Sequence, residues 1–238
     1  MRGIDRSFVC TSLVAGLTLA WAAAGPAPSW AQSPTTAVEE PASPITGWFR
    51  LDVDSLGTQL WFGATHQLGG VALASDIYVT GTFAELDLGV TLTFGKLSLT
   101  PMAGIGFDFA AYDVASLIAP QLFTTYIQGP IYFDSWIQSF FNSPFVDGAR
   151  DLVYFRAFVV YELTEHLGVG PQVEASLYLN ESADGAGDDG LGSLPVGAQI
   201  NVGYGANSTL GIFLGYDTQY EGDGAGITGR FTFLRTWQ

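Results

Sequence analysis

The two histidines are the side chains best suited to acid–base chemistry at neutral pH. His66 lies at the end of a predicted strand, and His166 lies in a predicted tight turn. Both are therefore expected at the same rim of the fold, where a solvated histidine is the simpler interpretation. The sequence has no Gly-x-Ser-x-Gly motif, no phosphate-binding glycine loop and no His/Cys cluster with metal-ligand spacing. We therefore expect no catalytic residue, no metal and no cofactor, and we predict that the protein is not an enzyme.

Charged residues of both signs recur on one phase of segments that alternate apolar and polar side chains. That phase is expected to face an enclosed lumen. In one interpretation, arginines and carboxylates form a network that stiffens a narrow barrel, because buried charges need partners. In the other, the excess of carboxylates lowers the barrier for cations. The predicted lumen charge network consists of Arg50, Asp52, Asp54, Asp76, Glu85, Asp87, Asp108, Arg156, Glu162, Glu174, Asp217 and Arg230.

The elements that must position these charges are best seen in segments 86–94 and 97–109, which are split by Gly95-Lys96. Both alternate apolar with polar or small residues almost without a fault. A period of two indicates β-strands, because successive side chains leave opposite faces. Strands of roughly 10 residues with one apolar face are typical of a transmembrane barrel. We predict an all-β fold, a single antiparallel transmembrane β-barrel.

About ten strands are expected, and every second connection between them is a tight turn. The remaining connections include all the long loops, which is the pattern of outer-membrane barrels with short periplasmic turns. An even number of strands places both termini at the periplasmic rim. The ten predicted strands are 47–54, 59–66, 73–80, 86–94, 97–109, 152–163, 167–179, 194–204, 209–220 and 227–237.

The segment 110–151 is the least barrel-like part of the chain and is predicted to be a long, partly helical outer loop. Aromatic and aliphatic residues recur in it at steps of three and four, which is helical spacing. Such an apolar loop folds inward as a lid, rests on the outer leaflet or contacts a partner. In a competing interpretation, residues 121–137 form one more hairpin, which gives twelve strands. The predicted lid residues are Phe133, Trp136, Ile137, Phe140 and Phe141.

The first 44 residues are expected to lie outside the barrel. Residues 1–31 have an arginine-containing start, an apolar run and small residues before a cleavage point, as in a secretory signal peptide. Residues 32–44 form a polar, proline-containing lead-in, so the predicted barrel spans 45–238. The chain carries 23 Asp+Glu against 8 Lys+Arg. This acidity argues against a nucleic-acid partner, whose phosphates need lysine and arginine.

The C-terminal strand carries Phe231 and Phe233 and ends with Trp237-Gln238. With the alternating strands, this end resembles the small bacterial outer-membrane β-barrel proteins, although Arg235 interrupts the apolar phase. The resemblance implies the outer membrane of a Gram-negative bacterium, contact with outer-membrane lipid and recognition of the last strand by the barrel-assembly machinery.

Three functions remain open from the sequence. The first is a narrow, cation-favouring pore or a small-solute binding barrel with a loop lid, its solute unknown. The second is a structural or surface-interaction barrel that displays the aromatic loop. The third is a lipid-modifying outer-membrane enzyme.

Overall fold

The computed structural model describes residues 45–109, 113–142, 150–181, 189–205, 207–219 and 226–237. The predicted signal peptide and lead-in, residues 1–44, lie outside the described residues. Within the described ranges, no helix has the length and apolarity needed to cross a membrane.

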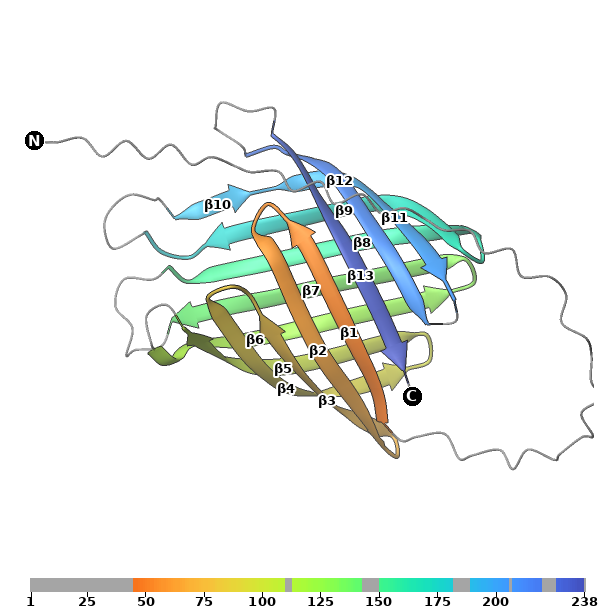
Figure 1. Cartoon of the computed structure of the whole chain (residues 1–238), viewed down its shortest axis with the longest axis horizontal. Helices are drawn as coiled ribbons and strands as arrows, with labels where there is room; N and C mark the ends of the chain where they lie inside the picture. The colour runs from red at the N-terminus through yellow and green to blue at the C-terminus, as the bar shows by residue number, and fades with distance from the viewer. Residues whose placement is uncertain are drawn as a thin grey trace, which may run out of the picture. The chain divides into compact units, whose positions relative to one another are not determined.

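The described chain forms one closed antiparallel β-barrel (Figure 1). Except at β10, each strand pairs with the next one along the chain, and β13 pairs with β1 to complete the circle. The short β10 and the longer β11 both pair with β9, so they occupy one position in the wall, and the barrel has twelve strand positions. The strands are β1 Ile45–Asp54, β2 Gly57–Leu68, β3 Val71–Val79, β4 Phe83–Phe94, β5 Leu97–Asp108, β6 Asp113–Gln128, β7 Ile131–Asn142, β8 Leu152–Thr164, β9 Leu167–Tyr178, β10 Gly190–Ser193, β11 Pro195–Tyr204, β12 Ser208–Asp217 and β13 Ile227–Trp237.

The expectation of ten strands with a long outer loop at 110–151 is wrong, and the twelve-strand alternative is confirmed. Strands β6 and β7 run through that segment and pair with each other and with β5 and β8. The helical spacing misled because a step of four residues also preserves the face of a strand. Thus Phe133, Ile137 and Phe141 share one face of β7, and Trp136 and Phe140 share the other.

The two faces of the wall reverse the usual pattern of burial. Outward residues are apolar and exposed, with Leu88 and Leu214 each 64% exposed. Inward residues include buried carboxylates such as Glu85 and Asp87, each 1% exposed. This reversal is expected of a barrel whose outside faces lipid and whose inside is polar. The predicted inward and outward phases of segments 86–94 and 97–109 are therefore confirmed.

The two ends of the barrel differ in the lengths of their connections. Strand β1 starts and β13 ends at one rim, together with the short connections 69–70, 95–96, 129–130, 165–166 and 205–207. We call this rim the turn end and the opposite rim the loop end. The longer connections, 143–151, 179–189 and 218–226, all belong to the loop end. His66 and His166 both lie toward the turn end, as predicted.

Candidate functional site

Three arginines on the inner wall meet carboxylates carried by β1, β7 and β9. Arg50 on β1 donates to Asp52 through Nε at 3.0 Å and Nη2 at 2.6 Å. Arg230 on β13 donates to Asp54 on β1 at 2.9 Å and to Glu174 on β9 at 2.9 and 3.1 Å. We call this set the charged belt, and its members are Arg50, Arg156, Arg230, Asp52, Asp54, Asp134 and Glu174.

The belt is positioned by alternation and register together. Arg50, Asp52 and Asp54 occupy every second place on β1 and so point inward together. Arg156 on β8 lies directly opposite Glu174 on β9 in the strand register. Closure of the barrel by the β1–β13 pair then brings Arg230 beside the β1 carboxylates. No segment of the sequence contains the belt by itself.

Arg156 is bound differently from the other two arginines. Its Nη1 lies 4.0 Å from Asp52 Oδ2 and its Nη2 lies 3.8 Å from Asp134 Oδ1, both beyond hydrogen-bond distance. Its Nε is buried and has no hydrogen-bond partner within the described part of the chain. The guanidinium lies 5.8 Å from the centre of the Trp136 ring.

A second group of charges lies on β3 and β4 and has carboxylates only. Asp76 and Asp87 lie directly opposite each other in the register, and Glu85 is two residues from Asp87. Gln138 on β7 donates to Glu85 at 2.6 Å, and Gln121 on β6 donates to Asp87. None of the ion pairs found among the described residues includes these carboxylates, which we call the carboxyl cluster.

Aromatic rings fill the lumen between the belt and the carboxyl cluster. Trp136 stacks on Phe123 with ring centres 5.6 Å apart, and its edge meets Trp61 at 6.1 Å. Trp61 in turn stacks on Tyr78 at 4.5 Å. The indole N–H of Trp136 donates to Gln121 at 2.8 Å, so the ring is held by stacking, by an edge contact and by a hydrogen bond. These side chains narrow any passage at this level.

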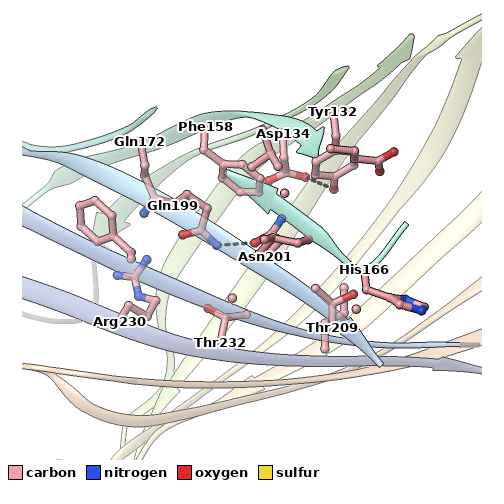
Figure 2. Close-up of a pocket in the computed structure, with 18 of the residues that line it drawn as sticks. Tyr132, Asp134, Phe158, His166, Gln172, Gln199, Asn201, Thr209, Arg230 and Thr232 are labelled. Carbon is pink, nitrogen blue, oxygen red and sulfur yellow. Dashed lines mark hydrogen bonds between the residues drawn. The ribbon is translucent and has the colours of Figure 1, made fainter. Parts of the chain in front are cut away.

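On the turn-end side of the belt, the lumen widens into a cavity of about 360 Å³. Its inner end is bounded by Arg50, Arg156 and Arg230, and its lining reaches His166. Amide and hydroxyl side chains line the wall between, together with the rings of Phe158 and Phe213. Figure 2 shows Gln172, Gln199, Asn201, Thr209 and Thr232 around this space, with Gln199 donating to Asn201 at 2.6 Å.

The structure brings most of the predicted network together, but in two separate groups. Six predicted members belong to the belt, and three form the carboxyl cluster. Asp217 lies at the loop end of β12 and accepts from the backbone N–H of Leu194 at 2.8 Å. Glu162 lines the cavity near the turn end, and Asp108 ends β5 at the loop end.

The sequence interpretation missed the contributions of β6 and β7 because it treated them as a loop. The missed residues are Asp134, Gln121 and Gln138, together with the indole N–H of Trp136. The inward series of Tyr132, Asp134, Trp136 and Gln138 alternates with an outward series, and that alternation was the available signal.

The predicted lid residues belong to the wall of the barrel. Trp136 is buried in the lumen, while Ile137 and Phe141 are exposed on the outward face at 42% and 40%. The expected loop lid at these positions is therefore wrong, because the backbone that carries them is paired on both sides with β6 and β8.

The histidines do not join the charged lumen groups. His166 is exposed in the turn between β8 and β9, with Nε2 3.5 Å from Glu165 Oε1. His66 lies opposite Leu73 on the outward phase of β2 and is exposed. The backbone N–H of His166 donates to the hydroxyl of Thr164 at 3.2 Å, and no hydrogen bond joins either imidazole ring to a hydroxyl among the described residues.

Comparison with solved structures finds the same barrel fold in other proteins. The NanC porin superposes with a TM-score of 0.53 and 8% identity, covering 81% of this chain and 99% of that one. A membrane protein solved in work headed "Unveiling the Mechanism Behind the in-meso Crystallization of Membrane Proteins" gives 0.54 and 14%, covering 81% and 83%. No family model matches the sequence, and no curated protein does. The resemblance to outer-membrane β-barrel proteins is thus confirmed as a likeness of fold.

Proposed function

We propose that this protein is a narrow outer-membrane barrel that admits small polar solutes from the turn end and does no covalent chemistry. The observation that carries the proposal is the cavity of about 360 Å³ that ends on the charged belt. If the lumen served only stability, we would expect its side chains to be closely packed. Instead it contains a cavity that can hold several water molecules and is lined by amides, hydroxyls and charged groups. The NanC porin, which shares the fold, is named as a porin and supports the same class of function.

The outward face supports a place in the outer membrane. Among strand residues whose side chains are described, Arg235 is the only Asp, Glu, Lys or Arg on the outward phase. It lies near the turn end, two residues before Trp237, where a long cationic side chain can reach the headgroups. We propose that lipid contacts this face and that the barrel-assembly machinery recognises β13, after a signal peptide has directed secretion.

We also propose a preference for cations. Carboxylates outnumber arginines among the charged inward residues, and the carboxyl cluster carries no arginine at all. An excess of acidic groups on a pore wall lowers the barrier for cations and raises it for anions. The aromatic rings at Trp61 and Trp136 keep the passage narrow, so we expect a small conductance.

Recording from planar bilayers tests the pore. Refolded protein is expected to give small single-channel currents, with a reversal potential in a KCl gradient that favours K⁺. Glu85→Gln should reduce that preference, whereas Arg235→Gln, a single-charge change on the outward face, should leave it unchanged. Barrels that insert fully folded and carry no current at all would refute a pore.

The other two functions lose support from the fold. The surface-interaction hypothesis relied on an aromatic outer loop, and the described aromatic residues of that segment belong to strands β6 and β7. A lipid-modifying enzyme needs an acid–base group beside a nucleophile. Both histidines lie toward the turn end, and among the described residues neither imidazole ring is hydrogen-bonded to a hydroxyl that could act as a nucleophile.

A further inference from the structure

We propose that the carboxyl cluster is a proton-binding site, in which Asp87 shares one proton with Asp76 or Glu85 at neutral pH. The shared proton stabilises the contacts of β3 and β4 with β6 and β7 across the lumen. The inference goes beyond the proposed function and does not depend on conduction. One shared proton leaves two of the three carboxyls ionised, so the acidic excess that is proposed to favour cations remains.

The three carboxyls converge where their side chains are almost completely buried. Asp76, Glu85 and Asp87 are 4%, 1% and 1% exposed. Asp76 lies directly opposite Asp87 in the strand register, and Asp87 is within side-chain hydrogen-bonding reach of both Asp76 and Glu85. A Cβ at Gly104 would clash with Asp87 Oδ1 and with Glu85 Oε1, so these two oxygens face the same point.

The donors around the cluster are too few for three ionised groups. Gln138 on β7 donates to Glu85 Oε1, and Gln121 on β6 donates to Asp87 Oδ1. Glu85 Oε2 is buried and has no hydrogen-bond partner among the described residues. A buried oxygen of a carboxylate that lacks a donor is costly, whereas a protonated carboxyl group is itself a donor. The unpartnered oxygen therefore indicates a missing hydrogen, which a shared proton supplies.

The strands packed around the cluster present neutral groups to it. Gly63 on β2 and Gly104 on β5 lie opposite Asp76 and Asp87 in the register, and β6 and β7 present the two glutamine amides. None of the other titratable side chains described on the inward phase of β2 to β7 is a cation. These side chains are Tyr78, Asp108, Tyr132 and Asp134.

A proton is the ligand that fits these carboxyls. Like charges at this distance cannot all ionise without a cation beside them, and a carboxyl pair that shares a proton resolves the conflict. No group of three or more His, Cys, Asp or Glu side chains in the described ranges has an arrangement that could hold a metal ion.

Gln121 connects the cluster to the side chains that narrow the lumen. Its amide donates to Asp87 and accepts the indole N–H of Trp136 at 2.8 Å. Loss of the shared proton leaves three adjacent negative charges that repel one another. A folded state that holds a proton which the unfolded chain has already released becomes less stable as the pH rises. We therefore expect the barrel to lose stability on the alkaline side of neutrality.

Infrared spectroscopy of the refolded protein in an ester-free detergent tests the shared proton directly. We expect wild type at neutral pH to show the C=O stretching band of a protonated carboxyl group, and Asp87→Asn to lose it. The asparagine amide keeps an acceptor for Gln121 and supplies a fixed hydrogen toward the neighbouring carboxyls. Asp134→Asn, an inward aspartate outside the cluster, should keep the band.

Urea unfolding in lipid vesicles measures the pH dependence. Between about pH 7 and pH 9 the carboxyls of an unfolded chain are ionised. A proton held only by the folded barrel then lowers the folding equilibrium constant by up to about tenfold per pH unit. Asp87→Asn should have a smaller slope than wild type, and Asp134→Asn should have the wild-type slope.

The absence of the protonated-carboxyl band from wild type at neutral pH would overturn the inference, as would equal pH slopes for wild type and folded Asp87→Asn. Stability that increases with pH would also overturn it, since a cluster that ionises to bind a metal ion behaves in that way. If Asp87→Asn fails to fold, Glu85→Gln decides the matter by the same two measurements. The band in a barrel that passes no current would refute the pore and keep this site, and current without the band would do the reverse.

Discussion

Arg230 reaches Glu174 across two intervening strand positions, with Nη1 and Oε1 2.9 Å apart. The two residues are 56 positions apart in the chain, on β13 and β9. The same guanidinium contacts Asp54 on β1 through Nε at 2.9 Å. One side chain therefore ties three parts of the wall together through the lumen.

Removing Arg230 should destabilise the barrel strongly. Arg230→Gln leaves Glu174 and Asp54 buried without their cation, which costs about 3 kcal/mol or more in the free energy of unfolding. Urea unfolding in lipid vesicles, followed by tryptophan fluorescence, measures the loss. Adding Glu174→Gln to Arg230→Gln should restore part of the stability, since it removes one orphaned charge. Simple additivity of the two changes would show that the pair is not coupled.

Adjacent residues of β7 should respond in opposite ways to the same substitution. Ile137→Lys places a charge on the outward face near the middle of the strand and, if that face contacts lipid as proposed, should cost about 2–4 kcal/mol. Gln138→Lys places the ammonium beside Glu85, which accepts from Gln138 at 2.6 Å, and should be tolerated or stabilising. Folding efficiency in vesicles and urea midpoints report both. Equal effects of the two lysines would contradict the position of β7 in the wall.

Gly104 should not tolerate even one methyl group. A Cβ at this position would lie 2.2 Å from Asp87 Oδ1 and 2.6 Å from Glu85 Oε1. Gly104→Ala must therefore displace buried carboxyls that hold Gln121 and Gln138, at a cost of about 1–3 kcal/mol. Gly70→Ala is the matched control, because a Cβ there meets nothing within 4 Å. If the midpoint temperature of thermal unfolding changes equally in both variants, close packing around Gly104 is contradicted.

Trimming the aromatic group should widen the lumen. Trp61 is 5% exposed and lies between Tyr78 and Trp136. Trp61→Leu removes a ring from the narrow level and should raise the single-channel conductance in planar bilayers. Phe62→Leu, on the outward face of the same strand, should leave the conductance unchanged. If Trp61→Leu leaves the conductance unchanged, ions do not pass the part of the lumen occupied by Trp61, Tyr78 and Trp136.

The sequence by itself determined the class of fold and the face of most residues. An alternation with period two, as in Leu86–Phe94, is compatible with a β-strand and not with a helix. It also assigns the apolar and the charged side chains to opposite faces of the sheet without knowledge of any contact. It also predicted the turn-end location of His66 and His166 and the inward phase of Arg50, Arg156 and Arg230.

Only the tertiary structure decided how many strands close the barrel and which charges meet. The spacing of Phe133, Ile137 and Phe141 suits a helix and a strand face equally, and the choice was made by pairing with β6 and β8. Alternation states that Arg230 points inward but not that Asp54, 176 positions away in the chain, lies beside it. Register and closure set those distances, and they likewise left Arg156 without a hydrogen-bonding carboxylate. The physical reason is that a strand's period fixes direction locally, whereas contact across a lumen depends on the whole circuit of strands.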